Sequence, residues 1–480
     1  MGKIAFRFAI ISATAILISF VMAGDENKIP EYVGSQTCQP CHSEIYNSWK
    51  SSDHANMLVP IGNPTDLPLE IAKASMDLQK KLEKADFMVA GTLFISKDPS
   101  TGHYRFLGVA YDGKANTYKP SNLNLDWTTE CAGCHTTNMD ARNLKWSENG
   151  ISCEACHGPG GDHVAGMGDP DKIVSSKNAD ICGQCHGGND RQTGGNVMSD
   201  GSKWVVGFRP GMDLASLPGL QLTPVDPERL PPDPVANHLR TYNMWKASGH
   251  SKSLSRVIDN SRESADCYGC HSAEGFAARR QGEKVDITEK GSFTTLTCVT
   301  CHNSHNSQYP YQLVMEPQEL CNACHTQEAV LKGKGAKGIE DTRSFHSAVE
   351  CISCHMTEGN HLMKVIRPDD PDLPESRTDT CTLCHRDNNR DARARQLQDW
   401  HAFYKESMDP LQAYLKTVDS ALKENPDLLN PELKAKLDDV RSNLSIIIMD
   451  GSDGAHNLDY ALEIMAQAAR DLKKVRAAMK

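Results

Sequence analysis

The segment Cys153-Glu-Ala-Cys-His-Gly-Pro-Gly-Gly-Asp-His163 contains the pattern that decides how this chain is built. Its first five residues read Cys-x-x-Cys-His, and nine copies of that pattern account for all eighteen cysteines of the 480-residue chain. The paired cysteines are Cys38 and Cys41, Cys131 and Cys134, Cys153 and Cys156, Cys182 and Cys185, Cys267 and Cys270, Cys298 and Cys301, Cys321 and Cys324, Cys351 and Cys354, and Cys381 and Cys384. The histidines that close the motifs are His42, His135, His157, His186, His271, His302, His325, His355 and His385.

This pattern is typical of the covalent attachment site of c-type haem. Two cysteines three residues apart lie on one turn of helix, so each can form a thioether with a vinyl group of the same haem. The adjacent histidine then reaches the iron as its proximal ligand. The sequence therefore predicts nine covalently attached c-type haems, held by the eighteen cysteines and ligated by the nine motif histidines.

Paired cysteines also occur in disulfides, zinc sites and redox sites, but these fit the pattern less well. Disulfides are expected in secreted chains, but they give no reason for a histidine after every second cysteine. Structural zinc sites use Cys-x-x-Cys pairs without a fixed fifth residue. Redox-active Cys-x-x-Cys sites occur once or twice in a chain, within a βαβ pattern.

Histidines outside the motifs can supply the second axial ligands of the irons. Ten are present, and nine are predicted to be ligands: His54, His163, His238, His250, His305, His346, His361, His401 and His456. Three of these histidines follow a motif histidine closely: His163 by six residues, His305 by three and His361 by six. Each would lie near the same haem face as that motif histidine and could not easily reach the opposite face. Each should therefore ligate a neighbouring iron. Nine such ligands for nine irons predict that no iron is open and that no residue is catalytic.

The tenth of these histidines, His103, is interpreted as a residue of a surface strand. It lies in Thr101-Gly-His-Tyr-Arg-Phe-Leu-Gly-Val-Ala-Tyr111, followed by the turn pair Asp112-Gly113. Alternating side chains that end in Asp-Gly indicate a hairpin, with residues 92–96 as the expected partner strand. A small β-hairpin element is therefore expected near residues 86–118.

An internal repeat links two parts of the chain. His42-Ser-Glu-Ile-Tyr-Asn-Ser-Trp-Lys-Ser-Ser-Asp-His54 and His238-Leu-Arg-Thr-Tyr-Asn-Met-Trp-Lys-Ala-Ser-Gly-His250 share seven of thirteen positions, including both end histidines. On one continuous helix, the two histidines of each copy would be roughly 120° apart around the axis. Each histidine of a pair is therefore expected to serve a different haem.

The N-terminus resembles a signal peptide. Lys3 and Arg7 precede the apolar residues 8–21, and Val21-Met-Ala23 provides small residues for cleavage, so residues 1–23 are predicted to be removed. This places the protein in the periplasm, outside the cell or at the cell surface. No other apolar run is long enough for a membrane span, and the formal charge of −11 disfavours nucleic acid as a partner.

Motif spacing and proline content suggest how the chain is divided. Four motifs lie in residues 24–210, a proline-rich linker spans residues 211–236, and five motifs lie in residues 237–390. Residues 391–480 have apolar side chains at helical spacing, with Asn430-Pro431 and Asn457 as helix starts. These helices could also form a homo-oligomer interface. The expected fold is mainly α, with little regular structure wrapped around a haem array and long C-terminal helices.

The sequence resembles the multihaem cytochrome c superfamily that includes hydroxylamine oxidoreductase, octahaem tetrathionate reductase and pentahaem nitrite reductase. The resemblance is carried by Trp127-Thr-Thr-Glu-Cys-Ala-Gly-Cys-His135, the segment from Cys153 to His163, Cys351-Ile-Ser-Cys-His-Met356 and Gly454-Ala-His-Asn457, and it spans most of residues 32–480. The chain departs from the enzymes of this group, because no Cys-x-x-Cys-Lys motif occurs and no tyrosine is marked as a haem cross-link.

The expected function is electron transfer through nine bis-histidine haems, with other redox proteins or an extracellular acceptor as partners. Two alternatives stay open. One is a haem-dependent oxidoreductase of a small nitrogen or sulfur compound such as nitrite, hydroxylamine or tetrathionate. The other is a terminal reductase of extracellular metal oxides.

Overall fold

The computed structural model describes residues 31–140, 142–187, 204–218, 220, 222–231, 234–258, 260–288, 290–385 and 389–479. The predicted signal peptide, residues 1–23, lies outside these ranges. The side chains of residues 232–239, which include His238, also lie outside the described part. No helix within the described ranges is long and apolar enough to cross a membrane.

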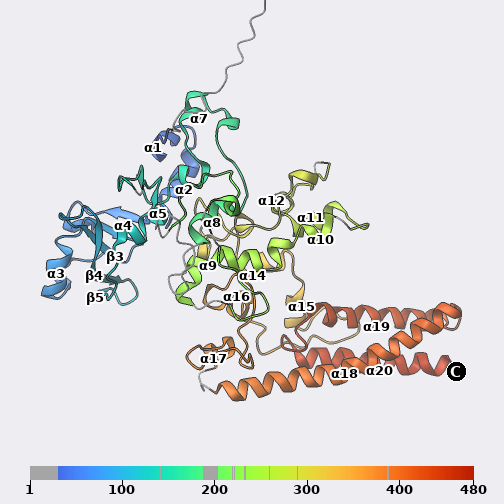
Figure 1. The fold of residues 1–480 in the computed structure, drawn as a ribbon. Coiled ribbons are helices and arrows are strands. Elements are labelled where there is room, and N and C mark those ends of the chain that lie inside the picture. The colour runs from blue at the N-terminus through green and yellow to red at the C-terminus, as the bar shows by residue number, and fades with distance from the viewer. Residues whose placement is uncertain are drawn as a thin grey trace, which may run out of the picture.

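The fold is mainly α-helical, with one small antiparallel sheet and long C-terminal helices, as predicted (Figure 1). The helices are α1 (Ser35–Cys38), α2 (Ser43–Lys50), α3 (Met76–Leu82), α4 (Trp127–Glu130), α5 (Ala132–His135), α6 (Cys153–His157), α7 (Gly161–Ala165), α8 (Asp180–His186), α9 (Pro234–Ala247), α10 (Ser255–Ile258), α11 (Ala265–His271), α12 (Ala273–Arg280), α13 (Cys298–Cys301), α14 (Pro317–Asn322), α15 (Gln327–Leu331), α16 (Cys351–His355), α17 (Thr380–Cys384), α18 (Arg390–Glu424), α19 (Pro431–Asp450) and α20 (Leu458–Ala478). The strands are β1 (Leu58–Pro60), β2 (Phe87–Val89), β3 (Leu93–Lys97), β4 (Tyr104–Asp112), β5 (Thr117–Pro120), β6 (Thr136–Thr137) and β7 (Glu148–Asn149).

Every Cys-x-x-Cys-His motif lies on or directly after a short helix. The backbone N–H of the histidine donates to the carbonyl of the first cysteine four residues earlier, as in His302 to Cys298 at 2.9 Å and His385 to Cys381 at 3.0 Å. Residues four apart on a helix lie on the same face. Each motif therefore presents its cysteines and its histidine to one side, where a single haem can meet all three.

The β-element is larger than the predicted hairpin. β3 pairs with β4, and β4 turns at Asp112 into β5, as expected from the sequence. The sheet continues to β2 and β1, in the order β1-β2-β3-β4-β5. β1 and β2 have only three residues each, so neither gives a recognisable alternating pattern.

This sheet is buried on both faces. One face packs against α3 through Leu78, Leu82, Phe94 and Val109. The other face packs Leu58, Val89 and Ile95 against Trp127 and Ala132 at the second haem motif. The sheet is thus a support for that motif as well as a small domain with its own core.

The C-terminal helices α18, α19 and α20 lie side by side and contain the largest apolar core (Figure 1). As predicted, Asn430 caps α19 by accepting from the N–H of Leu433, and Asn457 caps α20 by accepting from the N–H of Tyr460. The predicted stripe Leu437, Val440, Leu444 and Ile447 of α19 is buried in this core. Regular helix packing therefore occurs where the sequence has no haem motif.

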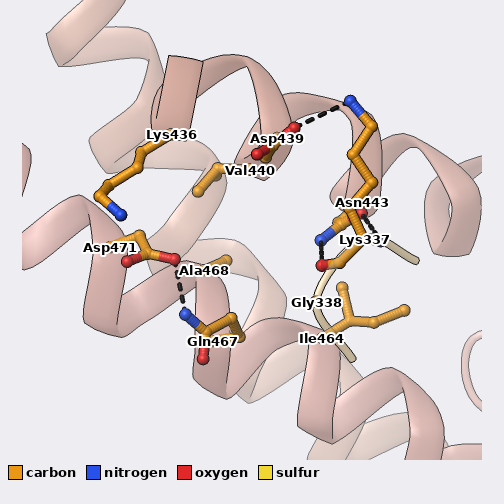
Figure 2. Close-up of a pocket in the computed structure, with 10 residues that line it drawn as sticks. All are labelled: Lys337, Gly338, Lys436, Asp439, Val440, Asn443, Ile464, Gln467, Ala468 and Asp471. Atoms are coloured by element: carbon orange, nitrogen blue, oxygen red, sulfur yellow. Dashed lines mark hydrogen bonds and ion pairs between the residues drawn. The ribbon is translucent and has the colours of Figure 1, made fainter. Parts of the chain in front are cut away.

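The loop that contains Lys337, between the seventh and eighth motifs, is hydrogen-bonded to α19. Lys337 N–H donates to Asn443 Oδ1 (2.8 Å), Asn443 Nδ2 donates back to the Lys337 carbonyl (2.9 Å), and Lys337 Nζ pairs with Asp439 (2.8 Å), as Figure 2 shows. Beside these contacts α19 and α20 leave a cavity of about 160 Å³, lined by Lys436, Gln467 and Asp471 among others. The tail is thereby held against the last haem motifs.

The expectation of one continuous helix across each copy of the internal repeat is wrong. α2 ends at Lys50 and α9 ends at Ala247, before His54 and His250. Ser52 N–H and Ser248 N–H donate to the carbonyls of Trp49 and Trp245 respectively, within turns that end these helices. His54 therefore lies in a turn, whereas His250 is the first residue of a separate 3-10 helix, His250–Lys252.

Candidate haem sites

Among the side chains that the structure describes, seven motif histidines face a second histidine across a gap. The ring centroids of the seven pairs are 6.0–6.4 Å apart. The pairs are His42 with His163, His186 with His54, His157 with His305, His325 with His250, His302 with His361, His385 with His346, and His355 with His456.

The width of these gaps fits one iron atom in each. A bond from a metal to an imidazole nitrogen is about 2.0–2.1 Å long, and the ring centroid lies about 1.1 Å behind that nitrogen. Two imidazoles on opposite sides of one iron would therefore have centroids roughly 6.3 Å apart. The seven measured separations lie within about 0.3 Å of this value.

Hydrogen bonds fix the orientation of several of these rings. Nδ1 of six histidines lies 2.7–3.1 Å from a main-chain carbonyl oxygen, which can only accept, so Nδ1 carries the proton and Nε2 keeps its lone pair. The six are His157, His163, His271, His302, His355 and His361. Such outer contacts set the tautomer of metal-binding histidines.

Burial keeps many of the rings neutral. It is the main cause that lowers the pKa of His54, His250, His302, His305, His346, His355 and His361. A neutral imidazole is the form that binds a metal ion. The paired histidines therefore have the spacing that axial ligation of haem iron requires, and these seven also favour the neutral form that binds a metal ion.

Histidines close in sequence to one motif lie opposite the histidine of another motif. His163 follows His157 but faces His42, and His361 follows His355 but faces His302. His305, three residues after His302, faces His157. In these three cases, the short loop after a motif contacts the site of an earlier motif. These contacts connect parts of the chain that are distant in sequence.

The seven pairs leave out four of the histidines that the sequence predicted as ligands. The motif histidine His271 is held by a contact from Nδ1 to the Ser253 carbonyl (2.9 Å), and the ring of His135 lies 6.5 Å from that of Trp127. Of the predicted distal ligands, the side chain of His238 is outside the described part. His401 lies on α18, where burial and the nearby Arg367 lower its pKa.

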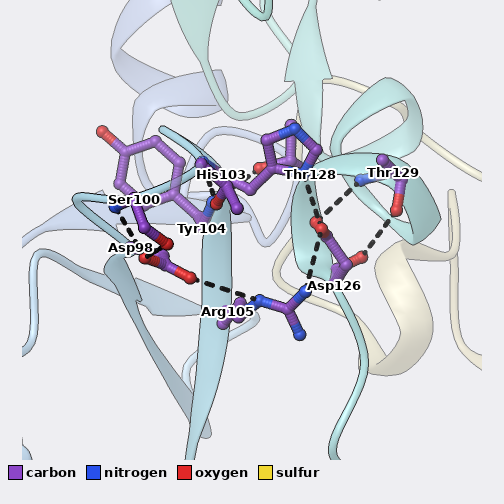
Figure 3. Close-up of polar contacts among 9 residues, drawn as sticks. Asp98, Ser100, His103, Tyr104, Arg105, Asp126, Thr128 and Thr129 are labelled. Carbon is purple, nitrogen blue, oxygen red and sulfur yellow. Dashed lines mark hydrogen bonds and ion pairs between the residues drawn. The ribbon is translucent and has the colours of Figure 1, made fainter.

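His103 occupies a polar cluster at the edge of the sheet (Figure 3). Its Nδ1 lies 2.6 Å from Asp126 Oδ2, and Arg105 Nη2 lies 3.7 Å from the same oxygen. Asp126 also caps α4, because Oδ1 accepts from the N–H of Thr129 (3.2 Å). The His103–Asp126 contact thus ties the start of β4 to the helix that precedes the second haem motif.

Contacts between cysteines show which motifs are neighbours in space. Five pairs of thiols from different motifs lie close enough to interact: Cys38 and Cys153, Cys134 and Cys185, Cys182 and Cys298, Cys270 and Cys324, and Cys321 and Cys351. Electrostatic interactions also relate Cys156 to Cys182, Cys301 to Cys321, and Cys354 to Cys384. In the haem-bound protein these sulfurs are thioethers, so the contacts measure only the proximity of the motifs.

Numbered by order in the sequence, the motifs connect as 1-3-4-6-7-8-9, with motif 2 beside motif 4 and motif 5 beside motif 7. The seven histidine pairs belong to the seven motifs of this main series. Motifs 2 and 5, which contain His135 and His271, are side branches.

The internal repeat of the sequence appears in the structure as two equivalent groups of three motifs. Trp49 Nε1 donates to the Ile151 carbonyl two residues before Cys153, and Trp245 Nε1 donates to the Leu296 carbonyl two residues before Cys298, both at 2.9 Å. The histidine that ends each copy faces the third motif of its group, which is motif 4 for His54 and motif 7 for His250. Motifs 2, 3 and 4 therefore correspond to motifs 5, 6 and 7.

One contact that supports the fourth haem motif could not be recognised from the sequence. A side chain at Gly183, inside the fourth motif, would place its Cβ 2.8 Å from the ring of Tyr242 and 2.7 Å from Leu214. Tyr242 reaches this position from the second repeat copy, where its hydroxyl donates to Asp180 Oδ1 (2.6 Å). The glycine lets an aromatic ring pack directly on the turn that carries the cysteines.

Family models match two parts of the chain. One, described as cytochrome c554 and c-prime, covers residues 37–85 and 109–158, and the other, described as a doubled CXXCH motif, covers residues 291–330. Together with the fold, these matches show that the chain belongs to the multihaem cytochrome c superfamily, whose members bind haem covalently.

Two solved structures share the fold over nearly the whole chain. The outer cell wall cytochrome OcwA is 25% identical, with a TM-score of 0.75 over 92% of this chain and 99% of that chain. The undecahaem cytochrome from the S-layer of Carboxydothermus ferrireducens is 23% identical, with a TM-score of 0.62 over 93% of this chain and 70% of that chain. A search among curated proteins finds no match.

Proposed function

We propose that this cytochrome conducts electrons along a series of seven bis-histidine haems, attached at motifs 1, 3, 4, 6, 7, 8 and 9, with two further haems beside motifs 4 and 7. The observation that supports this most directly is the set of seven histidine pairs at 6.0–6.4 Å, each centred on one motif of the spatial series. An iron with two imidazole ligands has no exchangeable site, which suits electron transfer and disfavours binding of a small substrate.

Electrons are proposed to enter and leave at the two ends of the series. Of the eighteen cysteines, two are exposed, and they are Cys41 of the first motif and Cys384 of the last. The helices α1 and α17, which lead into these motifs, lie far apart across the haem-bearing region (Figure 1). Because electron transfer slows steeply with distance between cofactors, haems near the surface are the ones that partner proteins or extracellular acceptors can reach.

The full complement is proposed to be nine haems, with His238 as a candidate sixth ligand for one of the branch haems. His401 lies on α18 beside Arg367 and Asp369, near the ninth motif, so it is not assigned to either branch. A location outside the cytoplasm, after removal of residues 1–23, is supported by the signal-like N-terminus and by the likeness to an outer cell wall cytochrome.

The haem count can be measured directly. Thioether-bound haem survives denaturation, so the intact mass of the secreted protein should exceed that of the chain beginning near Gly24 by nine haems. Replacing Cys384 and Cys381 by alanine should remove one haem. Fewer than nine haems in the unmodified protein would refute the proposed complement, and a cytoplasmic protein that keeps residues 1–23 would refute the proposed location.

A further inference from the structure

The turn between α19 and α20 places a buried carboxylate behind one haem ligand. His456 faces the motif histidine His355 at a centroid distance of 6.2 Å. Its other ring nitrogen, Nδ1, lies 2.7 Å from Asp450 Oδ1, and the Asp450 side chain is only 3% exposed. The ring thus has the eighth haem site on one side and a carboxylate on the other.

The local fold holds this carboxylate in place. α19 ends at Asp450, and Gly451 follows in the left-handed conformation at φ 69°, which turns the chain back toward the haem site. The hydroxyl of Ser452 donates to Asp450 Oδ2 and accepts from the N–H of His456 (3.1 Å). Asp450, Ser452 and His456 therefore form one hydrogen-bonded unit within a single turn.

This arrangement differs from the other outer contacts of the ligands. Nδ1 of His157, His163, His302 and His361, among others, donates to a neutral main-chain carbonyl. A carboxylate accepts the same proton more strongly and so increases the electron density on Nε2. It also adds a negative charge in a site with little solvent to screen it.

Both effects favour ferric over ferrous iron. The ferric bis-imidazole haem core carries one more positive charge than the ferrous core, so a nearby negative charge stabilises the oxidised form. A more basic imidazole is a stronger donor to the ferric ion in the same direction. Outer hydrogen bonds and buried charge are among the means by which a protein sets a haem potential.

We propose that Asp450 is a positioning residue that lowers the reduction potential of the haem at motif 8, through its hydrogen bond to His456. Reduction of this haem adds one electron to the iron, and the proton stays between Nδ1 and the carboxylate. Motif 8 lies between motifs 7 and 9 in the spatial series. A low potential at its haem therefore hinders electron transfer between the haem at motif 9 and the rest of the series. This inference rests on the proposed function, in which His456 ligates the iron at motif 8.

The test compares two single substitutions in the haem-loaded, full-length protein. Asp450→Asn keeps the shape and the hydrogen-bonding oxygen but removes the charge, so one haem of nine should titrate at a higher potential in a spectroscopic redox titration. The corresponding low-spin EPR signal should change, while the total haem content stays the same. The control is Asp126→Asn, the same change at the contact with His103, which is not one of the seven paired ligands (Figure 3); it should leave the signal of the motif 8 haem unchanged.

Two more variants separate failure of this inference from failure of the proposed function. His456→Ala should create one high-spin haem, and if it does not, the ligand assignment itself is wrong. If His456→Ala behaves as expected but Asp450→Asn shifts no potential, or produces a high-spin haem, the role given to Asp450 is refuted. Ser452→Ala removes a hydrogen bond from the carboxylate and keeps its charge, so it should lower the same potential further. This variant provides the test if Asp450→Asn fails to load haem.

Discussion

The ring of His305 lies parallel to that of His157, with 6.0 Å between the centroids and 4° between the planes. The two residues come from different halves of the chain, since one lies in the proposed four-haem region and the other in the five-haem region. Beside them, Asn306 Nδ2 donates to Ser51 Oγ (2.9 Å) and to the Ser48 carbonyl (3.3 Å). Iron coordination at motif 3 would therefore join the halves independently of the peptide linker.

Loss of this ligand should weaken the association of the halves. After proteolytic cleavage within residues 211–236, the fragments of His305→Ala should separate on size-exclusion chromatography at a lower denaturant concentration than those of the unmodified protein, although contacts such as Tyr242 with Asp180 still join the halves. The matched control is His250→Ala, since His250 and its partner His325 both lie in the second half. Each variant should show one high-spin haem, but only His305→Ala should lower the denaturant concentration at which the fragments separate. Equal behaviour of the two variants would contradict the joining role of His305.

The histidine pairs fall into groups by the angle between their ring planes. The angle is 23°, 4° and 28° at motifs 1, 3 and 6, and 68°, 80° and 84° at motifs 4, 7 and 9, with 58° at motif 8. Parallel imidazoles overlap the same iron dπ orbital and split the dπ pair, whereas perpendicular ones overlap different orbitals and leave the pair nearly degenerate.

Low-temperature EPR of the oxidised protein should therefore show two kinds of low-spin haem in comparable amounts. The near-parallel sites should give rhombic spectra, and the near-perpendicular sites should give highly anisotropic spectra with a large maximum g value. His250→Ala should remove intensity from the second kind, and His361→Ala should remove it from the first. A single kind of signal for all haems would contradict these ring orientations.

Local pattern was enough to predict much of this molecule. The Cys-x-x-Cys-His motifs predicted short helical turns with a haem, and the proximity of His305 to His302 excluded a shared haem. The periodic residues of α19 and α20 predicted two helices with their caps. In each case the signal lies within a few residues, where backbone geometry restricts the outcome.

The features that could not be predicted depend on contacts between segments that are far apart in the sequence. Nothing near His305 indicates that its partner is His157, because that pairing arises from the packing of two halves. The order of the motifs in space likewise follows from contacts such as Cys182 with Cys298, which are 116 positions apart in the sequence. β1 and the carboxylate of Asp450 were missed because a three-residue strand and a lone aspartate carry no pattern.

Gly183 should not tolerate a larger side chain. Gly183→Ala would bring a methyl group within 2.8 Å of the Tyr242 ring and 2.7 Å of Leu214, and overpacking of this kind typically destabilises a protein by about 1–3 kcal/mol. The variant should unfold at lower temperature or denaturant concentration and load less haem at motif 4. Gly291→Ala is the control, because nothing lies within 4 Å of a Cβ at that position. Equal stability of the two variants would show that Tyr242 does not pack on Gly183 in this way.

The proposed linker is held at one point by a single lysine, and this contact should govern its susceptibility to proteolysis. Lys364 Nζ donates to the carbonyls of Glu228 (2.6 Å), Arg229 (3.1 Å) and Pro227 (3.4 Å). Lys364→Met keeps the apolar stem and removes these hydrogen bonds, and losing about 1.4 kcal/mol of local stability would raise the population of the open segment tenfold. Trypsin should therefore cut after Arg229 roughly ten times faster in the variant. Lys434→Met, on α19, is the control and should be cut at the original rate. An unchanged rate in Lys364→Met would mean that other contacts, such as the hydrogen bond from Arg377 to the Pro231 carbonyl (2.6 Å), hold the segment.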